Sequence, residues 1–417
     1  MQILGPVFLL GIIGFYYFPS EKRKKFAFIY CIILAIVAFS FQPHISDDLY
    51  REYQNLDGIR QYGWSYFGMK QSQYYESTKF EGLYLTQLYY YIFAQFPINN
   101  LLPAVTTFIV YFLQFVMIEK VSRRYELSKL ETFCLYAFVL CTRETYMIMS
   151  GIRNHLAFTI AGYLIYIDLI ERRSRVRCFI GYIAMIFVHQ SAILILVIRL
   201  MNLIKNKKIK IGLALVLVVW SELLEVINVL LAKLPNIPII NSLIYKINIY
   251  TVNNGGNANN IVLRTRYLIY MLVWIPIIIA VFTTILRAFK YKYDNSVVNR
   301  KSIFWRELQH GRLIIKSNVC EPSAYDIQDI GWFLILSICF TVGSIAYYWL
   351  YLRSAMLLGI VGFIPSAILF YDWHHKKIGQ TKRKTNYIFF LGVLCMIKLL
   401  VIMLYMNRSM DFSLFAF

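Results

Sequence analysis

Cysteine is scarce in this sequence, and the cysteines that occur form no recognisable cofactor site. Only seven are present among 417 residues, and they show neither the spacing of a zinc site nor the even framework of a disulfide-stabilised protein. Several lie within apolar runs, namely Cys31, Cys134, Cys339 and Cys395. We therefore interpret them as packing residues and predict no metal ligands.

Glycine-rich nucleotide loops are also missing. Neither a Walker-type loop nor a dinucleotide-binding glycine pattern occurs. ATP and activated sugar nucleotides are therefore not the obvious substrates, and no cofactor is expected. The sequence also lacks a fixed-period repeat and a low-complexity tract.

Acidic residues are few, with 22 Asp and Glu against 43 Lys and Arg, which gives a formal charge of +21. Such an excess could indicate nucleic-acid binding if it formed one basic face. Here the cations gather in short segments between apolar runs. That arrangement is typical of the cytoplasmic loops of membrane proteins, so no nucleic-acid partner is expected.

Apolar residues make up 59% of the chain, and the mean hydropathy is +0.55. Soluble domains are about 45 to 50% apolar. Apolar runs long enough to cross the roughly 30 Å hydrocarbon core of a bilayer recur from end to end. The sequence predicts an all-α, polytopic integral membrane protein that forms a single membrane domain over residues 1–417.

About ten spans are expected. Their approximate ranges are 1–18, 26–42, 101–120, 130–149, 154–170, 211–231, 261–287, 330–348, 354–371 and 387–406. The first run has no basic start and no small-residue cleavage site, so we expect a span rather than a removable signal peptide. The basic run 22–25 places the following loop in the cytoplasm, and both termini then lie on the extracytoplasmic side.

Three segments between these spans have distinct expected roles. Residues 43–100 form an extracytoplasmic loop, in which 81–96 is too short for a span and predicts an amphipathic or re-entrant helix. A single crossing over 178–200 would place Lys205 and Lys210 outside, so this segment predicts a helical hairpin with His189 near its tip. Residues 288–328 are basic and polar and predict a cytoplasmic loop.

Several ionisable residues fall near the expected outer ends of helices. They are Arg143, Glu144, Arg153, His155, His189, Arg264, Arg266 and Arg353. Long cations that reach the interface beside an aromatic belt are the simpler interpretation. Cations on the outer side nevertheless run against the positive-inside rule, so a cluster there needs a cause. A phosphate-bearing lipid supplies one, because the planar fork of arginine matches phosphate oxygens and never loses its charge.

The segment 150–155, Ser-Gly-Ile-Arg-Asn-His, is informative because Gly151 allows a tight turn that starts a helix near Asn154. The backbone N–H groups of such a start, beside Arg153, favour an anion. His189 lies in an apolar stretch, where a histidine either is a hydrogen-bonded structural group or takes a hydroxyl proton. Asp47 and Asp48 are candidate general bases, or solvated loop residues.

Of two further acidic residues, only one is a candidate for the site. Glu81 begins the short aromatic stretch, where it either contacts substrate or caps a helix. Asp168 adjoins a cytoplasmic charge cluster and receives no functional assignment.

Two of these segments carry a family resemblance. Residues 150–157, Ser-Gly-Ile-Arg-Asn-His-Leu-Ala, are followed after a basic loop by residues 187–192, Phe-Val-His-Gln-Ser-Ala. Together they resemble the EpsG-like branch of the Wzy polysaccharide polymerases, which has a Gly-Ile-Arg-Gln segment and a later Phe-His-x-Ser-Ala segment. Asn154 stands where that family has glutamine. The match covers residues 40–200, and the remaining chain is similar only in hydropathy.

The resemblance implies a metal- and nucleotide-independent glycosyltransferase of the bacterial inner membrane. Such an enzyme polymerises oligosaccharide repeat units carried on undecaprenyl diphosphate into an O-antigen, capsule or exopolysaccharide at the extracytoplasmic face. Its expected partners are the lipid-linked oligosaccharide, membrane lipid, a chain-length regulator and a flippase.

The catalytic candidates on this interpretation are Asp47, Asp48, His189 and Arg153. The candidates for binding substrate or its diphosphate are Arg143, Arg153, Arg264, Arg266, Arg353, Glu81, Asn154 and His155. Two other functions remain open. A flippase would bind the diphosphate with the same arginines without forming a bond, and a membrane acyltransferase would use His189 as its base.

Overall fold

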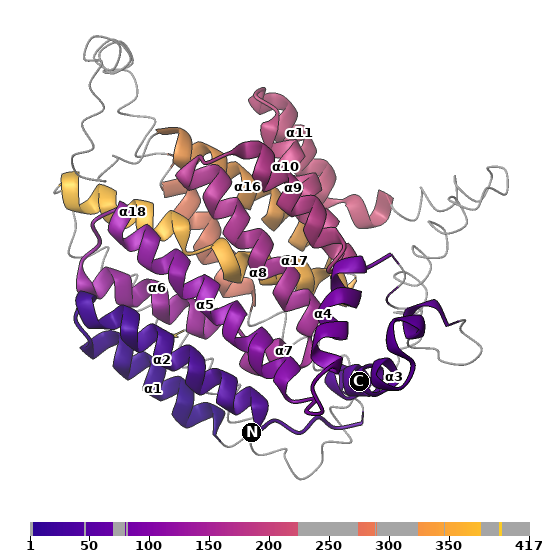
Figure 1. Ribbon diagram of the computed structural model, residues 1–417. Coiled ribbons are helices and arrows are strands. Elements are labelled where there is room, and N and C mark those ends of the chain that lie inside the picture. The colour runs from indigo at the N-terminus through magenta and orange to yellow at the C-terminus, as the bar shows by residue number, and fades with distance from the viewer. Residues whose placement is uncertain are drawn as a thin grey trace, which may run out of the picture.

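The computed structural model describes most of the N-terminal half of the chain and parts of the C-terminal half. The described residues are 3–45, 47–69, 80, 82–223, 274–287, 289, 324–345, 347–376 and 392–393. Every regular element in these ranges is a helix (Figure 1). The all-α fold class is therefore confirmed for the described part.

The first helices form a tightly packed group. They are α1 (Leu4–Tyr17), α2 (Ser20–Phe39) and α5 (Leu101–Arg124). α2 packs against both α1 and α5 (Figure 1). Gly14 of α1 meets the ring of Phe26 on α2 so closely that a Cβ would collide with it. The small residue thus allows these two helices to approach each other.

The loop expected between α2 and α5 contains more helix than the sequence indicated. It holds α3 (Asp48–Tyr62), the 3-10 helix η1 (Gly63–Gly68) and α4 (Tyr84–Ala94). α4 corresponds to the short amphipathic segment, whereas α3 falls where a plain polar loop was expected. α3 buries Leu49, Leu56 and Ile59 in a small separate core with Tyr66 and Tyr90. This amphipathic spacing explains why the polar segment is helical.

The segment 130–149, which was expected to form one span, is divided between two helices. α6 (Lys129–Thr142) ends at Arg143, whose backbone is extended with φ −98° and ψ 122°, and a short α7 (Thr145–Ser150) follows. The break occurs because Arg143 turns inward to donate a hydrogen bond to Thr159, on α8 (Ile152–Tyr166). The adjacent charged pair Arg143 and Glu144 marks this position in the sequence.

α8 occupies the centre of the bundle, where it contacts α5, α9 and α17. It continues into a π-helical turn, η3 (Ile167–Glu171), and then into α9 (Arg175–Ile186), the 3-10 turn η4 (Gln190–Ala192), α10 (Ile193–Leu203) and α11 (Lys207–Val218). Arg175 at the start of α9 and Arg199 near the end of α10 both reach Asp168. α9 and α10 are therefore antiparallel, with His189 in the turn between them.

Besides the helical stretch Trp274–Arg287, the C-terminal half supplies three further described helices to the bundle. They are α16 (Ala324–Gly343), α17 (Tyr348–Val361) and α18 (Ile364–Lys376). α16 begins within the range 288–328 that was expected to be a cytoplasmic loop, and most of that range lies outside the described residues. The expected span 387–406 lies outside them as well, apart from residues 392–393.

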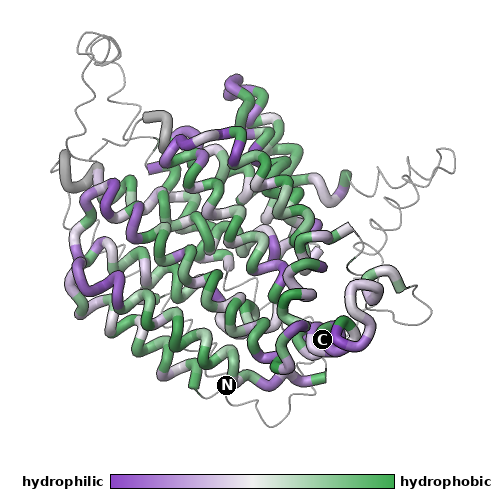
Figure 2. Tube along the Cα trace, in the orientation of Figure 1, coloured by the Kyte–Doolittle hydropathy of each residue, from purple (hydrophilic) through white to green (hydrophobic). Residues whose placement is uncertain are grey.

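Among the described residues, two helical stretches are long and apolar enough to cross a membrane, Leu101–Arg124 and Leu350–Tyr371. Shorter apolar helices cover Leu4–Tyr17, Gln190–Leu203, Trp274–Arg287 and Ile327–Gly343. Many large apolar side chains also face outward, among them Ile13, Ile36, Ile180 and Leu215, each more than half exposed. Figure 2 shows hydrophobic residues along the outward helices. Exposed apolar surface on this scale indicates contact with lipid or with another protein, whereas the count of ten spans stays a prediction.

Candidate functional site

Residues from four parts of the chain meet around the end of α8 that carries Arg153. α3 supplies Glu52, the turn between α9 and α10 supplies His189 and Ser191, and α17 supplies Arg353. We call these residues, with Arg153, the Arg153 site. In Figure 1, α3, α4 and α7 lie close to this end of the bundle, and α11 lies at the opposite end.

Arg153 lies in the first turn of α8, which begins at Ile152, two residues before the expected start. Its Nη2 lies 3.3 Å from Oε1 of Glu52, and its side chain is 19% exposed. Its guanidinium also lies over the ring of Phe80, with the carbon 5.3 Å from the ring centroid. A carboxylate and an aromatic face thus hold the fork in place while part of it remains accessible.

Glu52 is itself held by its neighbours. The Asn55 amide donates a 3.0 Å hydrogen bond to Oε2 of Glu52, and the Tyr66 hydroxyl donates a 2.8 Å bond to Oδ1 of Asn55. Glu52 is only 6% exposed. This chain of bonds fixes the partner of Arg153, although sequence reasoning placed Glu52 in a loop and assigned it no role. The helical spacing of apolar residues around it was the available signal.

His189 occupies the tip of the helical hairpin. Its Nδ1 accepts a 3.1 Å hydrogen bond from the backbone N–H of Ser191. With Nδ1 as acceptor, a neutral imidazole carries its proton on Nε2. Burial, followed by the positive charges of Arg353 and Arg153, holds the pKa of His189 well below its ordinary value. The ring is therefore neutral near pH 7 and presents an N–H donor.

Three hydrogen bonds fix the hairpin tip in the bundle. The Thr86 hydroxyl on α4 donates a 2.6 Å hydrogen bond to the carbonyl of Val188, and the Thr86 backbone N–H donates to the carbonyl of Phe187. On the other side, Nη1 of Arg353 donates a 3.2 Å bond to Oγ of Ser191. Neither Thr86 nor Ser191 was singled out from the sequence, although Ser191 belongs to the 187–192 motif.

Asp47 and Asp48 are adjacent in sequence but lie in opposite environments. Asp47 is 3% exposed. Its carboxylate accepts a 2.6 Å bond from the Tyr146 hydroxyl and a 2.8 Å bond from the His44 backbone N–H. The Asp48 side chain is 57% exposed and pairs with Arg51 one helical turn away. Asp47 is thus positioned by the fold, whereas Asp48 is a solvated surface residue.

Arg143 and His155 form an internal polar pair next to the Arg153 site. Nη2 of Arg143 lies 3.3 Å from Nδ1 of His155 and 3.2 Å from Oγ1 of Thr159. Arg143 is 2% and His155 7% exposed. These contacts fasten the break after α6 onto α8, which accounts for both residues without a substrate.

Asn154 has a buried side-chain oxygen, Oδ1, that lacks a hydrogen-bond donor among the described residues. A buried amide oxygen without a donor is costly, and this one lies next to Arg153 in the sequence. It is therefore suited to accept a bond from a substrate hydroxyl. Glu81, Arg264 and Arg266, the remaining candidates, lie outside the described residues.

Comparison of this chain with known families, proteins and structures identifies no relative. No family model, curated protein or solved structure matches the chain. The likeness to polysaccharide polymerases therefore rests on the two short motifs. The structure brings residues of both motifs, Arg153 and His189, within electrostatic reach of each other.

Proposed function

We propose that this chain is a membrane-embedded glycosyltransferase that joins oligosaccharide repeat units carried on a lipid diphosphate. The observation that carries the proposal is the convergence of Arg153, Arg353 and a neutral histidine at one end of a helix bundle. The outward-facing apolar side chains and the two long apolar stretches support a membrane location. The expected extracytoplasmic orientation of this end follows from the positive-inside rule.

In the proposed reaction, the bond between the anomeric carbon of the growing glycan and its phosphate oxygen breaks. A new bond forms between that carbon and a hydroxyl of the next repeat unit. The electron pair leaves with the lipid diphosphate, and the hydroxyl proton passes to a base. The protein must therefore stabilise a developing negative charge and accept one proton.

Arg153 and Arg353 are suited to the first task. Their forks match phosphate oxygens and stay charged at any physiological pH. Donors placed in advance around a leaving group are usually the largest catalytic contribution. Glu52 keeps Arg153 oriented at 3.3 Å before substrate arrives. His189 adds an N–H donor from Nε2, given that its Nδ1 is already engaged by Ser191.

Asp47 is the better candidate for the second task. Its carboxylate is fixed by Tyr146 and His44, whereas Nδ1 of neutral His189 already accepts a hydrogen bond and Nε2 carries the proton. A positioned carboxylate can take a hydroxyl proton as the new glycosidic bond forms. We therefore assign the base role to Asp47 and a donor role to His189.

The test is reconstitution of the full chain in liposomes with a synthetic repeat unit linked to undecaprenyl diphosphate. The proposal expects glycans longer than one unit, separated by size, with release of lipid diphosphate in equal amount. A flippase would move the lipid-linked unit across the bilayer without chain growth. Transport without elongation, for repeat units matched to the host polysaccharide, would overturn the proposal.

A further inference from the structure

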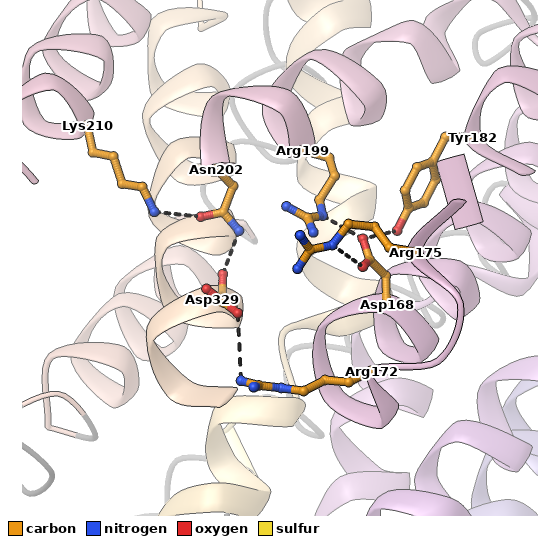
Figure 3. A network of polar contacts seen from close by, with 8 residues as sticks. All are labelled: Asp168, Arg172, Arg175, Tyr182, Arg199, Asn202, Lys210 and Asp329. Carbon is orange, nitrogen blue, oxygen red and sulfur yellow. Dashed lines mark hydrogen bonds and ion pairs between the residues drawn. The ribbon is translucent and has the colours of Figure 1, made fainter. Parts of the chain in front are cut away.

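A second polar cluster lies at the other end of α8, roughly 20 Å along the helix from Arg153 by the usual rise per residue. We call it the Asp168 network. Its members are Asp168, Arg172, Arg175, Tyr182, Arg199, Asn202, Lys210 and Asp329 (Figure 3). They come from η3, the turn after it, α9, α10, α11 and α16. The network therefore joins the hairpin to both halves of the chain.

Asp168 is the centre of one part of the network. Its Oδ2 accepts a 2.6 Å bond from Nε of Arg199 and a 3.3 Å bond from the Tyr182 hydroxyl. The side chains of Asp168 and Arg199 are both only 2% exposed. Nε is the one nitrogen of Arg199 that bonds to a described residue. The guanidinium also lies over the ring of Phe179, with its carbon 5.6 Å from the ring centroid, and its two terminal nitrogens donate no hydrogen bond to a described residue.

Asn202 is the centre of the other part. Its amide donates a 2.8 Å bond to the carbonyl of Asp329, and its Oδ1 accepts a 3.2 Å bond from Nζ of Lys210. Asn202 is 3% and Lys210 7% exposed. Figure 3 shows Arg199 and Arg175 pointing toward Asn202 and Asp329, while Lys210 approaches from the opposite side.

The charges of the network do not balance. Arg172, Arg175, Arg199 and Lys210 all act electrostatically on Asp329, but Arg172, Arg175 and Asp329 are 44%, 64% and 41% exposed. The buried charged members of the network are therefore two cations, Arg199 and Lys210, and one carboxylate, Asp168. The nearby Glu171 is already paired with Lys120 and Arg173. A buried excess of positive charge is unfavourable unless an anion offsets it. Two of the cations, Arg199 and Lys210, are more than nine-tenths buried.

We propose that the Asp168 network binds a phosphate group, held by the terminal nitrogens of Arg199 and by Lys210. Asp168 positions the guanidinium through Nε and leaves the fork free for the ligand. Arginine forks and lysine ammonium groups are the usual partners of phosphate oxygens. The phosphate comes either from an anionic lipid headgroup or from a soluble phosphate. This inference does not depend on the proposed glycosyl transfer.

The test measures the thermal unfolding of the purified full chain with two probes. One probe is phosphatidylglycerol added to phosphatidylcholine nanodiscs, and the other is inorganic phosphate in phosphatidylcholine alone, at matched ionic strength. A ligand that binds only the folded state raises Tm. The variant is Lys210→Met, and its matched control is Lys208→Met, which removes the same charge from an exposed position of the same helix.

The wild type and Lys208→Met should gain Tm with a probe, and Lys210→Met should need about tenfold more of it, as expected for loss of one charge-assisted bond. A response to phosphatidylglycerol alone identifies a lipid headgroup, and a response to inorganic phosphate identifies a soluble ligand. If the network is only structural, neither probe distinguishes Lys210→Met from Lys208→Met, whatever the Tm of the two variants without a probe. Equal responses of both variants, or no response of the wild type to either probe, would overturn the proposal.

Discussion

The two ends of α8 each pair an arginine with a buried carboxylate, yet they hold the arginine differently. At one end, Arg153 is 19% exposed and lies 3.3 Å from Glu52. At the other, Arg199 is 2% exposed and lies 2.6 Å from Asp168. The looser, partly exposed pair can exchange its carboxylate for a substrate phosphate. The tighter pair fixes the helical hairpin through Nε of Arg199, so at this end only the terminal nitrogens of the arginine are left for the phosphate proposed above.

The largest expected effect is at Asp168. Asp168→Asn leaves Arg199 buried without its counter-charge, and breaking a buried pair in this way costs about 3 to 5 kcal/mol. Denaturant unfolding in detergent measures the loss. The control is Asp48→Asn, which removes an exposed carboxylate and should change stability by less than about 1 kcal/mol. Equal losses in the two variants would contradict the tight, buried pairing of Asp168 with Arg199.

The next effect concerns activity at the Arg153 site. Arg153→Ala should slow glycan elongation on the order of 10²- to 10³-fold, as seen when one preorganised donor is removed. Arg51→Ala, which removes a partly exposed arginine from α3, should leave elongation unchanged. Arg153→Ala also leaves the buried Glu52 carboxylate without its ion-pair partner, which could unfold the protein. The double variant Arg153→Ala with Glu52→Gln removes that unpaired charge, so a loss of elongation in the folded double variant reports on the reaction and not on folding. Full elongation in a folded double variant would exclude Arg153 from the mechanism.

A smaller effect tests the attachment of the hairpin tip. Thr86→Val keeps the side-chain shape but removes the 2.6 Å hydrogen bond to Val188, at a cost of about 1 kcal/mol. Thr107→Val is the matched control, since the Thr107 hydroxyl is buried and has no hydrogen-bond partner among the described residues. Unfolding measurements should show a loss for Thr86→Val alone. A larger loss in Thr107→Val would contradict the assigned contact.

The smallest effect is the pH dependence of stability. The folded state lowers the pKa of His189 below its ordinary value of 6.5, so the unfolded chain takes up this proton first as pH falls. Stability should therefore decrease by about 1 kcal/mol between pH 6.5 and 5.5 through His189. His189→Gln should reduce that slope by the same amount. An unchanged slope would show that the imidazole does not titrate as described.

Much of the fold followed from hydropathy and charge. The apolar runs predicted α1 and α5 near their observed ends. α2 begins at Ser20, before the expected start at 26, so the basic run 22–25 that was expected to form a loop lies in the first turns of this helix. The break at Arg143 was not predicted, since a stretch of apolar residues conceals one inward-turning arginine. α3 was taken for a loop because its polar face outweighs its three buried apolar residues in any average over the segment.

The candidate site was predictable only in part. The Ser-Gly-Ile-Arg and His-Gln-Ser motifs drew attention to Arg153 and His189, and the structure brings these two residues into electrostatic contact. Glu52 contacts Arg153 and Thr86 contacts the hairpin tip beside His189. Both belong to elements distant in sequence, and no local sequence pattern predicts contacts between distant elements. Asp168 received no role because it adjoins a cytoplasmic charge cluster in the sequence, whereas the return of α10 buries it against Arg199.

The most direct test of the central claim is the affinity of the reconstituted chain for undecaprenyl diphosphate. Arg353, which contacts the hairpin tip through Ser191, is the residue to change. Arg353→Ala should weaken binding at least about tenfold, as expected for a lost charge-assisted bond, and Arg51→Ala should bind as the wild type does. Equal affinity of the wild type and Arg353→Ala would contradict a diphosphate site at this end of α8.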